Sequence, residues 1–196
     1  MASLQLGQRI VGVDPGLNIT GYGVLEVSTD GPRLCEAGVV RGSSRDSLTA
    51  RLGQIHAGVS DVVSSLAPSV MAVEQLYSHY KQPQTAILMG HARGVICLVA
   101  AQAEIPVFDY AATQVKKLLT GNGRAPKVQM QQAIQRELGL AELPEPADVA
   151  DALAIALCHY YLSRNIAAID VTNGNGPKGP SRKPRTPRSQ TSSPSA

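Results

Sequence analysis

The stretch RIVGVDPGLNITGYGVLEVSTDGPRLCEAGVVR, residues 9–41, decides the fold of this chain. It contains three apolar runs typical of β-strands, at residues 9–14, 20–27 and 34–41. Two turn signals, Pro15-Gly16 and Asp30-Gly31-Pro32, separate these runs. Because strands that follow one another through short turns usually pair antiparallel, residues 9–41 predict a three-stranded antiparallel meander.

Helical and strand-like segments alternate after residue 41. The predicted helices run from Arg45 (capped by Ser44) to Leu66, over residues 86–104 with Pro83 in the preceding turn, from a Thr113 cap to Gly121, over residues 126–138, and from Pro146 to about Asn165. The predicted later strands are residues 70–74 and 105–110. Since β-α-β connections favour parallel neighbours, the whole pattern predicts an α/β fold, a mixed five-stranded sheet with helices on both faces.

Composition narrows the class of protein. The chain has 196 residues, of which 43% are hydrophobic and 17% charged, which excludes collagen-like, coiled-coil and wholly disordered proteins. No uninterrupted apolar run approaches the roughly 20 residues of a membrane span, and the N-terminus does not resemble a signal peptide. We therefore expect a cytoplasmic protein without a membrane partner. Cys35, Cys97 and Cys158 are predicted to be reduced thiols and His159 a core histidine.

The positive charge of the chain is concentrated at its C-terminal end. Residues 172–196 contain five Lys and Arg, five Pro and no acid, so the remainder has 13 of the 18 basic residues and all 15 acidic ones. A segment with so few apolar side chains cannot offset its ordering entropy and is predicted to be disordered. It is interpreted either as a flexible arm for nucleic acid or as a solubilising tail. The predicted division is an extension at 1–8, a folded domain at 9–168 and a tail at 169–196.

Deleting residues 172–196 distinguishes the two interpretations of the tail. If the five cations contact DNA phosphates, their loss weakens DNA binding and makes the affinity less dependent on salt, because fewer counterions are released. We expect any activity of the folded domain on nucleic acid to be retained at saturating protein. The measurement is the slope of log affinity against log salt, and an unchanged slope would mean that the tail is not a DNA arm.

Four acidic residues are the candidates for chemistry. Asp14 and Glu74 each end an apolar strand-like run, IVGVD and VMAVE, where an open α/β sheet presents its site. Asp148 and Asp151 are three residues apart near the start of an apolar helix, which places them on one helical face. Four carboxylates together need a counter-cation, and all-oxygen ligation selects Mg²⁺ or Mn²⁺. Two such ions can support hydrolysis of a phosphodiester.

Each of these acids also has a purely structural explanation. Acids in the first turn of a helix interact favourably with the helix dipole, so Asp148 and Asp151 could be capping residues. Acids at strand ends are often solvated loop residues. Taken one at a time, these explanations are the stronger ones, and the catalytic interpretation depends on the segments that surround the four acids.

Those segments resemble one nuclease family. VGVDPGLNITGYGV, AVEQLYSHY, ARGV, QVKKLLTGNGRAPK and PADVADALAIALCH occur in the order and at the spacing of the RuvC family of Holliday-junction resolvases. The resemblance extends over nearly all of residues 9–165. It implies a ribonuclease-H-like fold and a homodimeric endonuclease that nicks two strands of a four-way DNA junction. It also implies the branch-migration proteins RuvA and RuvB as partners.

The resemblance also assigns roles to individual residues. The metal-binding carboxylates of the family correspond to Asp14, Glu74, Asp148 and Asp151, and its active-site lysines correspond to Lys116 and Lys127. DNA contacts are expected from Tyr77, Lys116, Lys127 and Arg124. Tyr77 stands where the family usually has Phe, which keeps a stacking ring and adds a hydroxyl. Lys127 directly follows the helix-opening Pro126, where a cation opposes the dipole, so it is the stronger candidate for phosphate contact.

The predicted reaction is hydrolysis assisted by two divalent ions, one held partly by Asp14, and it leaves a 5′ phosphate and a 3′ hydroxyl. No covalent intermediate is required. Two alternatives remain open from the sequence. The glycine-rich start GVDPGLNITGYG is similar to the first phosphate loop of actin-like ATPases, although those proteins need two such domains. A non-catalytic junction-binding module is the other.

Overall fold

The computed structural model describes the backbone of residues 4–76 and 83–172 and the side chains of residues 4–76 and 83–164. Its elements, in chain order, are β1 (Arg9–Asp14), β2 (Ile19–Ser28), β3 (Gly31–Arg41), α1 (Leu48–Leu66), β4 (Val70–Glu74), α2 (Pro83–Gln102), β5 (Val107–Tyr110), α3 (Ala112–Thr120), α4 (Lys127–Leu138) and α5 (Ala147–Thr172). The strands form one sheet in the order β3-β2-β1-β4-β5. β1, β2 and β3 pair antiparallel, whereas β4 pairs parallel with both β1 and β5. The predicted mixed five-stranded sheet is confirmed.

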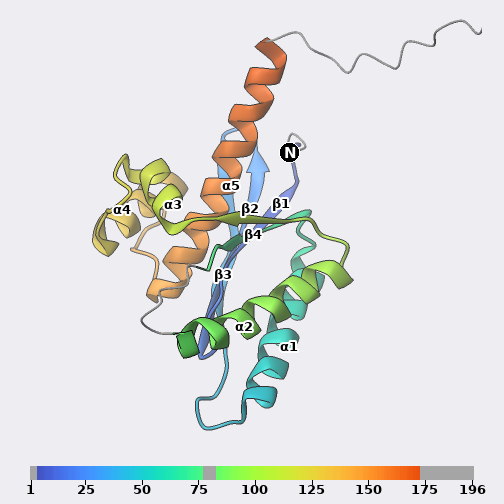
Figure 1. Cartoon of the computed structure of the whole chain (residues 1–196). Helices are drawn as coiled ribbons and strands as arrows, with labels where there is room; N and C mark the ends of the chain where they lie inside the picture. The colour runs from blue at the N-terminus through green and yellow to red at the C-terminus, as the bar shows by residue number, and fades with distance from the viewer. Residues whose placement is uncertain (1–3, 77–82, 173–196) are drawn as a thin grey trace, which may run out of the picture.

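Helices cover both faces of the sheet (Figure 1). Successive residues of a strand point to opposite faces, so Ile10 of β1 belongs to the core under α3, α4 and α5, whereas Val11 belongs to the core under α1 and α2. The central strands β1 and β4 are buried on both sides. This double burial explains why their sequences are continuous apolar runs rather than alternating ones.

Two glycines let α5 approach the sheet closely. A Cβ atom on Gly12 would lie 2.2 Å from the carbonyl oxygen of Ala152, and one on Gly21 would lie 2.0 Å from the carbonyl oxygen of Asp148. Any larger residue at either position would push the helix away from the sheet. Because Gly21 is paired with Asp14 in the β1–β2 register, this contact brings the first turn of α5 toward the end of β1.

Two predicted helix starts are wrong. Helix α1 begins at Leu48, and Ser47 rather than Ser44 is its cap, with the Ser47 hydroxyl accepting a 3.3 Å hydrogen bond from the backbone N–H of Ala50. Thr113 lies inside the first turn of α3 and does not cap it. Before α1 the segment SSRDS, residues 43–47, offers several capping residues, so the local pattern does not distinguish between them. Helix α3 instead follows Ala111, which has no side chain that can cap, and its start carries no capping signal.

Helix α5 extends to Thr172, past the predicted end near Asn165. Residues 166–171, IAAIDV, remain largely apolar, and the chain has no Gly or Pro until Gly174, so the sequence contains no stop signal at residue 165. Residues 169–172, predicted as the start of the disordered tail, are instead the last residues of α5. The rest of the predicted tail, from 173 onward, lies outside the described residues, as does Tyr77.

The buried polar residues have structural partners. The side chain of His159 lies between the hydroxyl of Tyr110, 2.8 Å from Nδ1, and that of Ser163, 3.2 Å from Nε2. Burial lowers the pKa of His159 to about 4, so the ring is neutral at physiological pH. Cys35, Cys97 and Cys158 are free thiols, and burial raises the pKa of Cys158 to about 12. The predicted core histidine and reduced cysteines are confirmed.

Helix α2 is largely apolar, although His91 and Arg93 interrupt its apolar runs. By length and composition alone it could cross a membrane, and it is one such helix among the described residues. Ala92, Ile96, Val99 and Ala100 are buried against the sheet core. Ile87 and Leu98 are 60% and 50% exposed. The helix therefore has one face in the core and a second apolar face at the surface.

Candidate active site

Three elements bring the four predicted carboxylates together. β1 and β4 are parallel neighbours whose register pairs Val13 with Val73, so Asp14 and Glu74, the next residue on each strand, end at the same edge of the sheet. Helix α5 contributes Asp148 from its first turn and Asp151 one turn later. All four side chains are half-buried. We refer to Asp14, Glu74, Asp148 and Asp151 as the carboxylate cluster.

The charges of the cluster act on Asp14 above all. Burial raises the pKa of Asp14 to about 8, and the carboxylates of Glu74, Asp151 and Asp148 add to the shift. Protonated Asp14 donates a hydrogen bond to the Glu74 carboxylate. Asp14 therefore holds a proton at neutral pH, and the cluster carries less negative charge than its four acids suggest.

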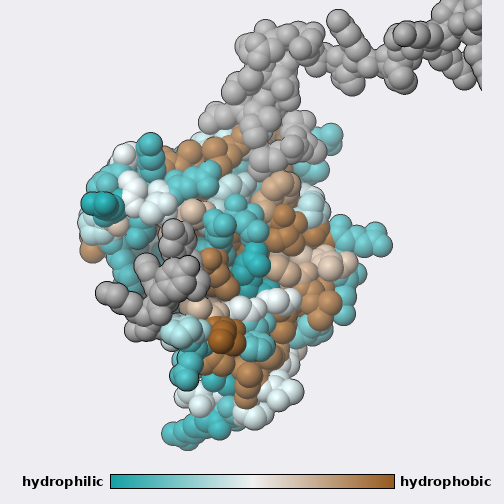
Figure 2. Space-filling view, viewed as in Figure 1, coloured by the Kyte–Doolittle hydropathy of each residue, from teal (hydrophilic) through white to brown (hydrophobic). Residues whose placement is uncertain are grey.

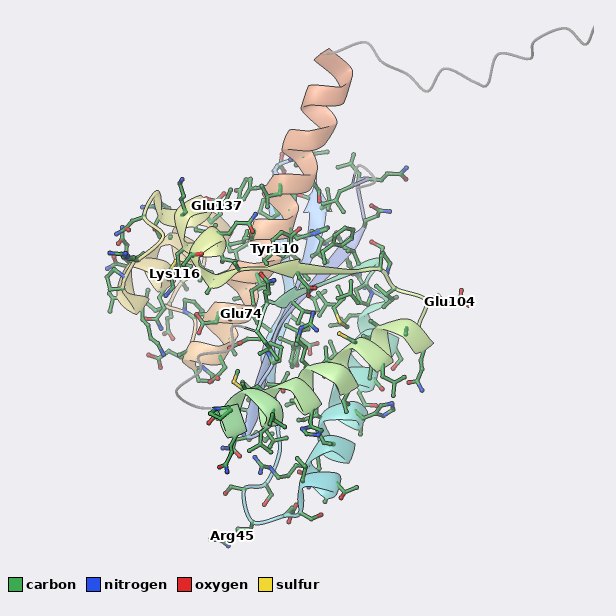
Figure 3. All side chains as sticks on the ribbon, viewed as in Figure 1. Arg45, Glu74, Glu104, Tyr110, Lys116 and Glu137 are labelled. Atoms are coloured by element: carbon green, nitrogen blue, oxygen red, sulfur yellow. The ribbon has the colours of Figure 1, made fainter. Side chains whose placement is uncertain are left out.

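Two lysines counter the remaining charge. Burial and the carboxylate of Asp151 raise the pKa of Glu74, whereas Lys116 lowers it. Burial also raises the pKa of Asp151, which both Lys127 and Lys116 lower. Figure 3 shows Lys116 on α3 on the same side of the sheet edge as Glu74. The structure thus places both predicted lysines beside the carboxylate cluster.

The lysines differ in position. Lys116 is half-buried on α3 and interacts electrostatically with two carboxylates, whereas Lys127, the first residue of α4, is exposed and interacts with one. The sequence favours Lys127 for phosphate contact, but Lys116 lies deeper in the site.

Arg124, the other predicted DNA contact among the described residues, is exposed in the loop between α3 and α4. Its backbone N–H donates a hydrogen bond to the Asn122 side chain, and no contact joins it to the carboxylates.

The sequence does not predict the hollow that adjoins Asp14 and Glu74. It has a volume of about 680 Å³, and its apolar walls include Leu76, Ala86 and Met89. A hollow of this size is typical of sites that hold part of a small molecule or nucleotide. Its walls come from the ends of β1 and β4, from α2 and from the start of α3, so no local sequence pattern marks it.

Comparison with known proteins identifies the family to which this chain belongs. The family model described as crossover junction endodeoxyribonuclease RuvC matches residues 10–159. The chain belongs to the RuvC family. A crossover junction endodeoxyribonuclease RuvC from Rhodopirellula baltica is 59% identical over 158 residues, which cover 80% of this chain and 88% of that protein.

Solved structures agree with the family assignment. The Thermus thermophilus RuvC structure has a TM-score of 0.74 and 37% identity, over 81% of this chain and 96% of that one. The T. thermophilus RuvC in complex with Holliday junction substrate has a TM-score of 0.73 and 35% identity, over the same shares of the two chains. The expected ribonuclease-H-like α/β fold is therefore confirmed. Membership in the RuvC family also decides against the actin-like ATPase alternative.

The donor set of this RuvC-family site suits a hard divalent cation. Carboxylate oxygens are the ligands that Mg²⁺ and Mn²⁺ prefer. Burial, together with repulsion between the carboxylates, raises the pKa values of Asp14, Glu74 and Asp151 even though the two lysines lower those of Glu74 and Asp151, so a bound cation would relieve the repulsion. Within the described residues, however, no three His, Cys, Asp or Glu side chains are already arranged as a group that could hold a metal ion. The cluster has the right chemistry, and its side chains must converge further to enclose a cation.

Proposed function

We propose that this RuvC-family protein resolves four-way DNA junctions by paired, metal-dependent nicks made at the carboxylate cluster. The observation that carries the proposal is the convergence of Asp14, Glu74, Asp148 and Asp151 at one edge of the sheet with Lys116 and Lys127 beside them. An acidic cluster repels a DNA phosphate unless cations intervene. A phosphodiesterase site of this composition therefore needs bound divalent ions as well as the two lysines.

The four carboxylates would hold Mg²⁺, or Mn²⁺, in this site. When bound, such ions make a water nucleophilic at neutral pH and stabilise the charge that develops on the leaving oxygen. Lys116 is half-buried between the cluster and solvent, so it is placed to contact a phosphate oxygen while it limits repulsion among the carboxylates. Asp14 must lose its proton to become a ligand, since its pKa is about 8. We propose products with a 5′ phosphate and a 3′ hydroxyl.

A nicking assay on a synthetic four-way junction tests the function. Each strand carries a 5′ label in turn, and the protein is incubated with Mg²⁺, with Mn²⁺ or with a chelator. We expect symmetric nicks in two strands that DNA ligase can reseal, and no nicks with the chelator. Tight junction binding without nicking in either metal would instead identify a non-catalytic junction-binding module.

We also propose that the protein acts as a homodimer through α2. A Cβ atom built on Gly90 or Gly94 has no neighbour within 4 Å, so these glycines do not pack against the sheet of their own chain. They lie in a shallow hollow of about 490 Å³ whose walls include Ile87 and Leu98. Figure 2 shows apolar residues on the side of the molecule formed by α1 and α2. A second copy of α2 fits this surface, because paired nicks require two symmetric sites.

Replacing Gly90 by leucine tests the dimer. Since nothing lies within 4 Å of the new Cβ, the variant should fold, and leucine favours the helix by about 1 kcal/mol relative to glycine. We expect the side chain to hold a second α2 away, which shifts the protein to monomer and replaces paired nicks by single ones. Light scattering over a range of concentrations measures the first effect, and the ratio of double to single nicks measures the second.

Gly53→Leu is the matched control for this variant. Gly53 is an exposed glycine on α1, its built Cβ also has no neighbour within 4 Å, and it does not line the hollow. We expect Gly53→Leu to remain dimeric and to make paired nicks. If Gly90→Leu dimerises as tightly as the control, the dimer contact lies elsewhere.

Two further proposals follow from membership in the RuvC family alone. We propose that the protein works in the cytoplasm and that the branch-migration proteins RuvA and RuvB deliver its junction. No surface of this chain is assigned to those partners. Copurification of the protein with RuvA and RuvB on junction DNA, compared with each protein alone, is the measurement.

A further inference from the structure

A second hollow borders the carboxylate cluster on the Asp148 side. It has a volume of about 580 Å³, and its walls include Arg51, Asp148, Asn18 and Thr85. These residues come from α1, α5, the β1–β2 loop and the start of α2. Met89 lines this hollow as well as the apolar one beside Asp14 and Glu74, so the two hollows adjoin at that side chain. A DNA strand that crosses the cluster can continue into this second hollow.

Arg51 is the cation of this hollow, and its charge has no carboxylate partner. One guanidinium N–H group donates to the side-chain oxygen of Asn18, while Nε is buried and makes no hydrogen bond. Arg93 also has a buried Nε without a hydrogen bond, but its guanidinium forms an ion pair with Asp109. Among the described residues no ion pair involves Arg51, and the internal segment outside them, residues 77–82, contains no acid.

A partly buried guanidinium without a counter-anion is costly unless an anion completes the site. The other polar groups that line the hollow favour a phosphate, because the hydroxyls of Ser44 and Thr85 can each donate a hydrogen bond. Arginine binds phosphate through two parallel N–H groups, and its bond to Asn18 fixes the plane of the guanidinium. The Asp148 carboxylate in the same hollow repels a free anion, which favours a phosphate held by a strand already bound at the cluster.

We propose that this hollow is a phosphate subsite for the strand that is nicked, with Arg51 as its cationic ligand and Asn18 as the residue that orients it. Helices α1 and α2, which line the subsite, cover the opposite face of the sheet from α3 and α4, which carry Lys116 and Lys127. The strand would therefore be held on both sides of the scissile phosphate. Arg51 thereby positions the strand without taking part in the hydrolysis. This inference rests on the proposed junction nicking.

The test compares Arg51→Gln with Arg45→Gln in the full-length protein. Arg45 is an exposed cation of the same segment, and Figure 3 shows it at the end of the molecule away from Glu74. Binding to a synthetic four-way junction is measured in chelator over a range of salt. We expect Arg51→Gln to reduce the magnitude of the log–log salt slope by about 0.9, the value for one lost phosphate contact, and to slow nicking at saturating enzyme by about tenfold. Arg45→Gln should leave both unchanged.

Arg51→Lys keeps the charge and loses the fork of two N–H groups. We expect it to retain the wild-type salt slope but to nick severalfold more slowly, since a lysine does not fix the phosphate in one orientation. If thermal unfolding shows that Arg51→Gln does not fold, the nicking rate of Arg51→Lys tests the subsite by itself.

An unchanged salt slope in Arg51→Gln, an equal change in Arg45→Gln, or full nicking by Arg51→Lys would each overturn the subsite. A wild-type protein that fails to nick the junction would instead remove the proposed function, so the two failures are distinguishable.

Discussion

Replacing any member of the carboxylate cluster by its amide is expected to reduce junction nicking by several orders of magnitude while junction binding is retained or improved. The changes are Asp14→Asn, Glu74→Gln, Asp148→Asn and Asp151→Asn. Each keeps the size of the side chain and removes a charge that a divalent ion needs as ligand. In chelator, the changes at Glu74, Asp148 and Asp151 also remove negative charge that repels DNA phosphates, whereas Asp14 is already protonated at neutral pH, so junction affinity should not fall in any of the four variants. Single-turnover nicking in Mg²⁺ and binding in chelator are the two measurements.

Glu104→Gln is the control for this series. Glu104 is an exposed acid after the end of α2, and Figure 3 shows it far from Glu74. It should nick like the wild type. Near-wild-type nicking by any two of the four cluster variants would falsify the assignment of the site, even if the protein is a junction resolvase.

The sheet was predictable because its determinants are local. The apolar runs of β1 and β4, the turns around Pro15 and Asp30, and the helix between successive parallel strands all lie within short stretches of sequence. Strand order then follows from the general rules for connecting strands. The late start of α1 has a tertiary contribution, since the backbone N–H of Gly42 bonds to the carbonyl of Asn18 and ties the segment before α1 to the β1–β2 loop. The start of α3 was missed because its cap position, Ala111, has no capping side chain.

That the four acids lie together was predictable, but their electrostatics were not. Strand ends and helical spacing indicate that Asp14, Glu74, Asp148 and Asp151 can meet. Only the structure shows how deeply these carboxylates are buried, because the burial of Asp14 depends on the close approach of α5 to the sheet at Gly12 and Gly21. The importance of Arg51 was hidden for the same reason: its neighbours Asn18 and Asp148 are distant in the sequence.

The raised pKa of Asp14 implies a large dependence of stability on pH. The carboxyl group has a pKa of about 8 in the folded protein and 3.8 as a model group, so between these values the folded state holds a proton that the unfolded state has lost. The free energy of unfolding therefore decreases as pH rises from about 4 to 8, and the cost of burying Asp14 is greatest at the upper end. Removing this acid should stabilise the metal-free protein, most strongly at pH 8.

Asp14→Asn is accordingly expected to raise the free energy of unfolding by roughly 2–4 kcal/mol at pH 8 in chelator, and by much less at pH 5. The corresponding rise in Tm is about 5–15 °C. Asp61→Asn, at an exposed acid on α1, should change neither value.

Adding Mg²⁺ should reverse the order of the two proteins. A cation that binds only the folded state stabilises the wild type by mass action, whereas Asp14→Asn has lost a ligand and gains little. The same reasoning predicts that the wild type binds Mg²⁺ more tightly as pH approaches 8, because Asp14 then gives up its proton more readily. If the Tm of the wild type at pH 8 does not depend on Mg²⁺, Asp14 is not a metal ligand. If Asp14→Asn is no more stable than Asp61→Asn in chelator, the burial of Asp14 does not destabilise the metal-free protein. If the carboxylates repel one another in the metal-free protein and together bind a cation when one is present, both effects must be observed.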